Sequence, residues 1–122
     1  MLKCRNCDEI YDLIFYAQCA AGQCSKCACE NMEELKPKIA DFKTEKHIPI
    51  ISKTDKGIKV TIGSTLHPMI ESNWITMIQV EWENNLYRKY LKPGDKPEAE
   101  FPIDTLNVKA FEYCNVHGYW SN

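Results

Sequence analysis

Cysteine crowding near the N-terminus constrains this chain more than any other feature of its sequence. Six of the 7 cysteines lie within the first 29 of 122 residues. A segment this short cannot build an apolar core of its own, so a covalent or coordinate bond must order it. In a reducing cytosol, crowded cysteines bind metal more often than they form disulfides. The sequence therefore predicts a metal-binding knuckle over residues 1–36 and a separate domain over residues 37–122.

The spacing of these cysteines indicates a four-thiolate site. Cys4 and Cys7 form one pair separated by two residues, and Cys24 and Cys27 form a second. Two such pairs are typical of rubredoxin-like and zinc-ribbon sites. Because tetrahedral thiolate sites bind both iron and zinc, the pattern predicts a metal without identifying it.

Composition and charge exclude several classes of protein. Charged residues make up 26% of the chain and hydrophobic residues 44%, as in folded globular proteins. The net charge of -2 arises from interspersed acids and bases, without the clustered basic face that nucleic-acid binding requires. No apolar run approaches the roughly 20 residues of a membrane helix, and the N-terminus lacks the apolar region of a signal peptide. We therefore expect a cytoplasmic protein that binds neither nucleic acid nor membranes.

The chain from Lys46 onward predicts an all-β fold. Short runs rich in Ile, Val, Thr, Tyr and Trp alternate with turn residues at intervals of roughly ten residues, a spacing typical of a β-sandwich or barrel. Turns are expected at Asp55-Lys56-Gly57 and at Asn84-Asn85, where asparagine tolerates positive φ. The charged segment from Glu33 to about Thr44 is predicted to be a linker. The expected strands are Ile48–Ser52, Ile58–Ile62, Trp74–Trp82, Leu86–Leu91, Glu98–Ile103 and Asn107–Tyr113.

All three histidines lie within two residues of a proline or a glycine. His67 precedes a proline, which favours extended backbone, so its side chain should project from a strand end or a loop. Cys114 and His117 form a Cys-x-x-His pair. With His47 and His67, they would supply three imidazoles and one thiolate, which suit iron or zinc if they converge. Taken singly, such a histidine is more often a hydrogen-bonded residue, and Cys114 a small buried hydrophobe, so the pattern alone leaves both readings open.

Four motifs follow one another in this second domain. They are Glu45–Ile50, Gly63–Met69, Leu91–Phe101 and Glu112–Trp120. In content, order and interval they resemble the desulfoferrodoxin and neelaredoxin superoxide reductases, over a stretch from about Thr44 to the C-terminus. The resemblance implies an immunoglobulin-like β-sandwich whose loops hold one mononuclear iron. In that family four histidine nitrogens surround the iron in a plane, a cysteine thiolate binds axially, and the sixth position is open.

The resemblance assigns four iron ligands and exposes one departure. His47, His67 and His117 fall on three of the four family histidines, and Cys114 falls on the axial cysteine. At the interval of the fourth histidine, six residues after His67, this sequence has Asn73. A carboxamide is a weaker ligand for Fe(II) than imidazole. The iron site therefore either coordinates Asn73 loosely, recruits a water molecule, or has a second vacant position.

The activity implied by the resemblance is the one-electron reduction of superoxide to hydrogen peroxide. Lys46 supplies a positive charge that can attract the anion and organise a proton-donating water. Glu45 resembles the family carboxylate that closes the sixth position when iron is ferric. Outside the motif, both would be taken for solvated charges. The resemblance also implies a rubredoxin-like electron donor and a homodimer.

The N-terminal cysteines resemble the four-cysteine iron centre of full-length desulfoferrodoxins. That centre ends in two adjacent cysteines; here Cys27 matches the first, but Ala28 stands at the second. Either Cys24 or Cys29 must therefore replace the missing ligand. The other expected ligands are Cys4, Cys7 and Cys27. Iron in this knuckle would permit electron transfer to the second site, whereas zinc would be structural.

Two rival functions follow from the same residues. In the first, the chain is a non-catalytic iron electron-transfer protein, whose second site is degenerate because of Asn73. In the second, it is a β-sandwich interaction module with structural metal. We expect the enzyme, because the residues around Asn73 otherwise keep the family motifs.

Overall fold

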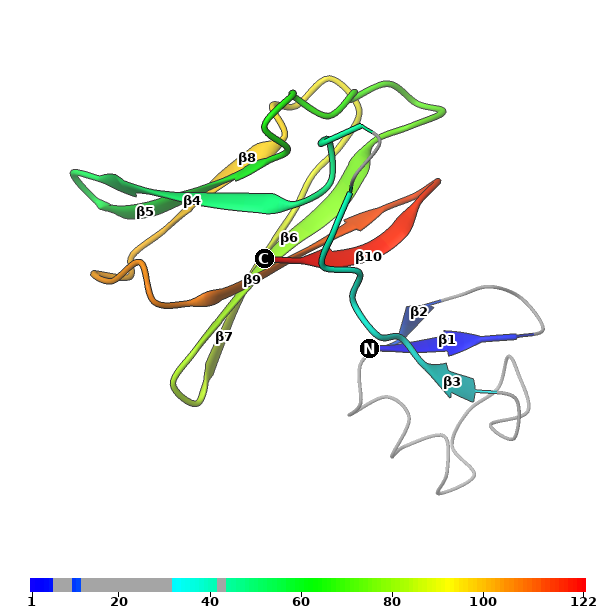
Figure 1. Ribbon diagram of the computed structural model, residues 1–122, viewed down its shortest axis with the longest axis horizontal. Helices are drawn as coiled ribbons and strands as arrows, with labels where there is room; N and C mark the ends of the chain where they lie inside the picture. The colour runs from blue at the N-terminus through cyan, green and yellow to red at the C-terminus, as the bar shows by residue number, and fades with distance from the viewer. Residues whose placement is uncertain (6–9, 12–31, 42–43) are drawn as a thin grey trace. The chain divides into compact units, whose positions relative to one another are not determined.

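The computed structural model describes residues 1–5, 10–11, 32–41 and 44–122 (Figure 1). The chain divides into two compact units, Met1–Lys36 and Pro37–Asn122. Every regular element in the described residues is a β-strand. No helix in this part of the chain is long and apolar enough to cross a membrane.

The first unit contains a small antiparallel sheet. Its strand order is β2-β1-β3, formed by β1 (Leu2–Cys4), β2 (Ile10–Tyr11) and β3 (Met32–Glu34). Cys4 is completely buried at the end of the central strand. The other residues assigned to the knuckle, Cys7, Cys24, Cys27 and Cys29, lie outside the described residues. The four-cysteine site stays a prediction.

The second unit is a sandwich of two antiparallel sheets, which confirms the predicted all-β, immunoglobulin-like fold. The four-stranded sheet has the order β10-β9-β6-β7, and the three-stranded sheet has the order β4-β5-β8 (Figure 1). The strands are β4 (Pro49–Thr54), β5 (Gly57–Ile62), β6 (Ile75–Trp82), β7 (Asn85–Tyr90), β8 (Glu98–Phe101), β9 (Lys109–Cys114) and β10 (Gly118–Ser121).

The core of the sandwich follows from alternation along its strands. In β5, Ile58, Val60 and Ile62 are completely buried, whereas the residues between them are partly exposed. Side chains one residue apart point to opposite faces of a sheet, so this pattern places one face of β5 against the other sheet. Cys114, at the end of β9, belongs to the same buried cluster. Its sulfur therefore lies in largely apolar surroundings.

Three sequence predictions about local structure were wrong. The β6–β7 turn was expected at Asn84-Asn85, but Asn85 pairs with Trp82, so the turn residues are Glu83 and Asn84, with a positive φ of 49° at Glu83. The last strand, β10, was not predicted. The expected linker is also shorter, because Lys38 forms a parallel bridge with Trp120.

Strand direction brings the predicted site residues to one end of the sandwich. β4 begins just after His47, and its antiparallel partner β5 ends before the loop that carries His67. In the other sheet, β6 begins after Asn73, while its antiparallel partner β9 ends at Cys114. Antiparallel pairing places the start of one strand beside the end of the next. His117 completes the group from the turn between β9 and β10.

Candidate metal centre

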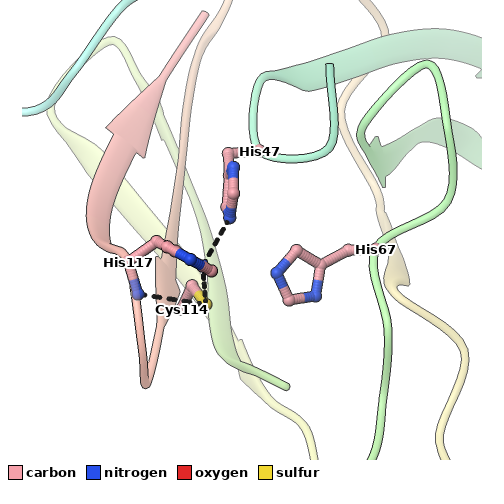
Figure 2. Close-up of side chains that lie close together, drawn as sticks. All are labelled: His47, His67, Cys114 and His117. Atoms are coloured by element: carbon pink, nitrogen blue, oxygen red, sulfur yellow. Dashed lines mark hydrogen bonds between the residues drawn. The ribbon is translucent and has the colours of Figure 1, made fainter. Parts of the chain in front are cut away.

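Four side chains predicted as metal ligands meet at this end of the sandwich. The donor atoms of His47, His67, Cys114 and His117 all lie within 4.8 Å of one another. Figure 2 shows the four side chains lying close together, with Cys114 and His117 on one hairpin and His47 and His67 on two other segments of the chain. Three of them are buried, and only His117 is exposed. The four residues therefore converge, which their spacing in the sequence could not establish.

His47 presents its Nε2 atom to the group. Nε2 lies 3.1 Å from Nδ1 of His117, while Nδ1 of His47 lies 2.7 Å from Oδ2 of Asp41. Burial lowers the pKa of His47, although the bond to Asp41 acts in the opposite direction. A neutral ring that donates from Nδ1 to a carboxylate keeps the lone pair of Nε2 free for a metal.

Asp41 is a site residue that sequence reasoning missed. Its carboxylate accepts hydrogen bonds from the Thr44 hydroxyl at 2.7 Å, the Thr44 backbone at 3.3 Å and the Lys46 backbone at 3.1 Å, besides the bond with His47. Burial raises the pKa of Asp41, but these hydrogen bonds outweigh it and hold that pKa well below its ordinary value. Asp41 is thus a fixed anion behind His47. The available signal was a carboxylate six residues before a candidate ligand, in a segment predicted to be a linker.

His67 also presents Nε2, because its other nitrogen is occupied. Nδ1 lies 2.6 Å from the carbonyl oxygen of Pro68 and donates to it. Nε2 is buried and has no hydrogen-bond partner among the described residues. Burial lowers the pKa of this ring, which favours the neutral form. A buried nitrogen without a partner requires an explanation, and a bound metal ion provides one.

Cys114 and His117 are held together by the turn between β9 and β10. The backbone N–H of His117 donates to Sγ of Cys114 at 3.4 Å, and Nδ1 of His117 lies 3.6 Å from the same sulfur. Burial raises the pKa of the Cys114 thiol, while backbone hydrogen bonds from His117 and Val116 lower it. A thiol buried in this way loses its proton readily only to a metal or a comparable positive charge. Three imidazoles and one sulfur fit iron or zinc.

The comparison with protein families agrees with this geometry. A family model described as Desulfoferrodoxin matches residues 39–122. The chain belongs to the desulfoferrodoxin family. The resemblance inferred from the sequence motifs is confirmed.

Individual relatives point the same way. The chain is 45% identical over 118 residues to a desulfoferrodoxin of Nitratidesulfovibrio vulgaris, an alignment that covers 97% of this chain and 90% of that relative. The solved superoxide reductase of Treponema pallidum matches with a TM-score of 0.57 at 33% identity, covering 64% of each chain. A superoxide reductase of Giardia intestinalis matches with a TM-score of 0.53 at 27% identity, covering 64% of this chain and 95% of that one.

Asn73, the residue at which the family resemblance leads us to expect a fourth histidine, lies beside the group. Its Oδ1 atom is 3.4 Å from Sγ of Cys114. The backbone of Asn73 is fixed by two hydrogen bonds with Ile70, of 2.9 and 3.1 Å. The structure therefore brings this departure from the family pattern into contact with the predicted axial ligand.

The two charged residues predicted to assist catalysis, Glu45 and Lys46, have different surroundings. Glu45 is exposed, has a positive φ of 52°, and its Oε2 lies 3.2 Å from the hydroxyl of Ser64. Lys46 is half-buried, and its charge is one of the influences that lower the pKa of His67, after burial itself. Lys46 therefore places a positive charge near the candidate centre.

A second lysine, Lys38, was not predicted as a site residue. Its Nζ donates to the carbonyl oxygen of His117 at 2.8 Å and lies 4.8 Å from the centre of the Trp120 ring. Trp120 in turn stacks on His47, with ring centroids 4.5 Å apart and planes inclined by 11°. Lys38 thus supports two of the candidate ligands from outside the group.

Glu112 is an unusual buried acid on β9, two residues before Cys114. It is completely buried, and neither carboxylate oxygen has a hydrogen-bond partner among the described residues. Burial raises its pKa well above the ordinary value. Burial therefore favours the protonated form of Glu112, which lies on the same face of β9 as the sulfur.

Proposed function

We propose that this chain is a superoxide reductase that works at a mononuclear iron held by His47, His67, His117 and Cys114. The observation that carries the proposal is the convergence of three imidazoles and one sulfur within 4.8 Å. These are the residues that the family resemblance implies as iron ligands. A ferrous ion bound there supplies one electron, so that superoxide and two protons give hydrogen peroxide and the iron becomes ferric.

The chain prepares this site before the metal binds. Asp41 and the Pro68 carbonyl each hold Nδ1 of a histidine, at 2.7 and 2.6 Å, so both rings offer Nε2 to the same point. Fixing the tautomer in this way raises the basicity of the ligand and reduces the ordering required on binding. Cys114 would supply a thiolate ligand, which would increase the electron density at a bound iron.

Two lysines make the surroundings attractive to a small anion. Lys46 acts on His67, and Lys38 is bound to the His117 carbonyl. Positive charge near an open site raises the rate at which an anion such as superoxide arrives. Lys46 also orients a water that donates a proton. By resemblance, Glu45 would be the carboxylate available to a ferric ion held there; in this structure its Oε2 accepts a hydrogen bond from the Ser64 hydroxyl at 3.2 Å.

The remaining elements of the proposal come from the family resemblance. A rubredoxin-like donor returns the electron, directly or through iron in the N-terminal knuckle. The protein forms a homodimer. It works in the cytoplasm, where the crowded N-terminal cysteines stay reduced and available to metal.

A second candidate function is a non-catalytic iron electron-transfer protein. The observation that favours it is Asn73, which replaces an imidazole of the family by a weaker ligand. In that case the knuckle would carry the working iron.

Iron analysis and superoxide kinetics distinguish the two functions. The oxidised, iron-loaded protein should show a thiolate-to-iron charge-transfer band that is missing in Cys114→Ser, beyond the bands of a four-thiolate centre. The reduced wild type should consume superoxide stoichiometrically, whereas Cys114→Ser should not. Equal consumption by the two proteins would exclude the proposed enzyme, and absence of the band in an iron-replete sample favours the electron-transfer protein.

A further inference from the structure

Asn73 contacts the sulfur of the candidate centre. Of the polar side-chain atoms in the described residues, only Sγ of Cys114 forms a hydrogen bond with its carboxamide, at 3.4 Å. None of the three histidine rings does so. We propose that Asn73 serves as a hydrogen-bond partner of the Cys114 sulfur and not as a metal ligand. The inference rests on the proposed metal centre and concerns the number of ligands that the protein gives to it.

The position of Asn73 is set by the backbone. Its N–H donates to the Ile70 carbonyl at 2.9 Å, and its own carbonyl accepts from the Ile70 N–H at 3.1 Å. These two bonds close the short loop after His67 and hold the backbone of Asn73 in place, from which its carboxamide reaches the sulfur. The contact is as short as the bond from the His117 backbone N–H to the same atom, also 3.4 Å. Asn73 and His117 therefore approach the sulfur as two comparable hydrogen-bonding groups.

The carboxamide can serve both protonation states of the sulfur. A thiol donates to Oδ1, as the structure has it. A metal-bound thiolate can only accept, so Asn73 must then present Nδ2–H. Because Nδ2 has no other hydrogen-bond partner among the described residues, a half-turn about the Cβ–Cγ bond exchanges the two atoms without breaking a contact. Oxygen and nitrogen of a carboxamide have nearly the same shape, so the packing does not change.

Two consequences follow for the centre. The protein supplies four donors, from His47, His67, His117 and Cys114, so a six-coordinate ion keeps two positions for small exogenous donors such as water or azide. The hydrogen bond from Asn73 also withdraws electron density from the thiolate, a recognised means of tuning metal–sulfur centres. Asn73 is thus a positioning residue that acts through Cys114.

Cobalt(II) titration of the full-length apo-protein tests this inference without relying on activity. The bands of this centre are those lost in Cys114→Ser, which separates them from cobalt bound by the N-terminal cysteines. Asn73→Ala should move the thiolate-to-cobalt charge-transfer band to lower energy, because the sulfur loses a hydrogen-bond donor. The intensity of the ligand-field bands, which reports coordination number, should not change. A rise in that intensity would mean that a ligand had been lost and would overturn the inference.

Asn73→Asp gives shifts of opposite sign for the two roles. A coordinated carboxylate donates more charge to cobalt than a carboxamide, so it would move the charge-transfer band to higher energy if residue 73 were a metal ligand. As a neighbour of the thiolate, the carboxylate donates no hydrogen bond and adds a negative charge beside the sulfur. We therefore expect the band to move to lower energy, further than in Asn73→Ala. A shift to higher energy overturns the inference.

Asn115→Asp is the matched control for charge. Asn115 is next to Cys114 in the chain, but its carboxamide bonds to the Trp74 N–H at 2.8 Å and the Ser72 carbonyl at 3.3 Å, and does not contact the sulfur. Its effect on the charge-transfer band should be smaller than that of Asn73→Asp, and an equal effect overturns the inference. If the wild type shows no cobalt–thiolate band lost in Cys114→Ser, the inference and the proposed function both fail. If the wild type consumes superoxide while Asn73→Asp moves the charge-transfer band to higher energy, only the inference fails.

Discussion

Asp41 holds Nδ1 of His47 at 2.7 Å, with side chains only 8% and 5% exposed. Replacing Asp41 with asparagine keeps the shape of the group but removes its charge, so His47 becomes a weaker and less strictly oriented ligand. Iron affinity should fall about 10- to 100-fold. Competition with a chelator measures this directly. Asp104→Asn is the control, because Asp104 is 94% exposed and pairs with Lys53; an equal loss of affinity in that variant would contradict the assignment.

Lys46→Met should slow the reaction with superoxide. The half-buried ammonium lies near the candidate centre, and its removal weakens the attraction of an anion by about tenfold or more at low ionic strength. Stopped-flow measurement over a series of salt concentrations should also show a weaker salt dependence in the variant. Lys53→Met removes the same charge from the opposite end of β4, where Lys53 pairs with Ile58 near the hairpin turn. If both variants react alike, Lys46 has no special role.

Asn73→His should increase the retention of iron. The substitution places an imidazole where the family has its fourth, and imidazole is a better ligand for Fe(II) than a carboxamide. The dissociation rate of iron in the presence of a chelator is the appropriate measurement. Asn115→His adds the same ring to the adjacent loop without contacting the group. Retention that is unchanged in Asn73→His, or raised equally in Asn115→His, would mean that position 73 does not reach the metal even as histidine.

Glu112→Gln should remove a pH-dependent loss of stability. The pKa of Glu112 is raised by burial, so the folded protein keeps a proton that the unfolded chain releases above about pH 4.3. The contribution of Glu112 to the free energy of unfolding therefore falls as pH rises from that value toward its folded pKa. Urea unfolding of the apo-protein at pH 5 and pH 8 should show a smaller decline in the variant than in the wild type. An identical decline would mean that the buried carboxyl is ionised in both states.

The sequence predicted the site residues better than it predicted their surroundings. His47, His67, Cys114 and His117 could be identified because each belongs to a local motif, and Asn73 because it breaks one. Lys38 could not be identified, because it acts on His117, a residue 79 positions away in the chain. Asp41 was missed because it lies in the segment that was predicted to be a linker. A hydrogen bond across the fold leaves no periodic trace in the sequence.

The fold, too, was predicted only in part from the sequence. Alternation of apolar residues predicted most strands of the sandwich, because burial of one face imposes a period of two. β10 was missed because Gly118–Ser121 does not alternate: its last three residues, Tyr119, Trp120 and Ser121, are all buried. The β6–β7 turn was displaced by one residue because asparagine was expected to adopt the positive φ, whereas the pairing of Trp82 with Asn85 assigns that conformation to Glu83.

The hydrogen bond between His47 and His117 spans 70 positions of the chain. An ion bound by both rings would link the beginning of β4 to the turn before β10. Because a ligand that binds only the native state adds its binding free energy to folding, the loaded molecule should resist heat and proteases better than the empty one. Iron supply would then govern not only how many molecules work, but also how long each survives.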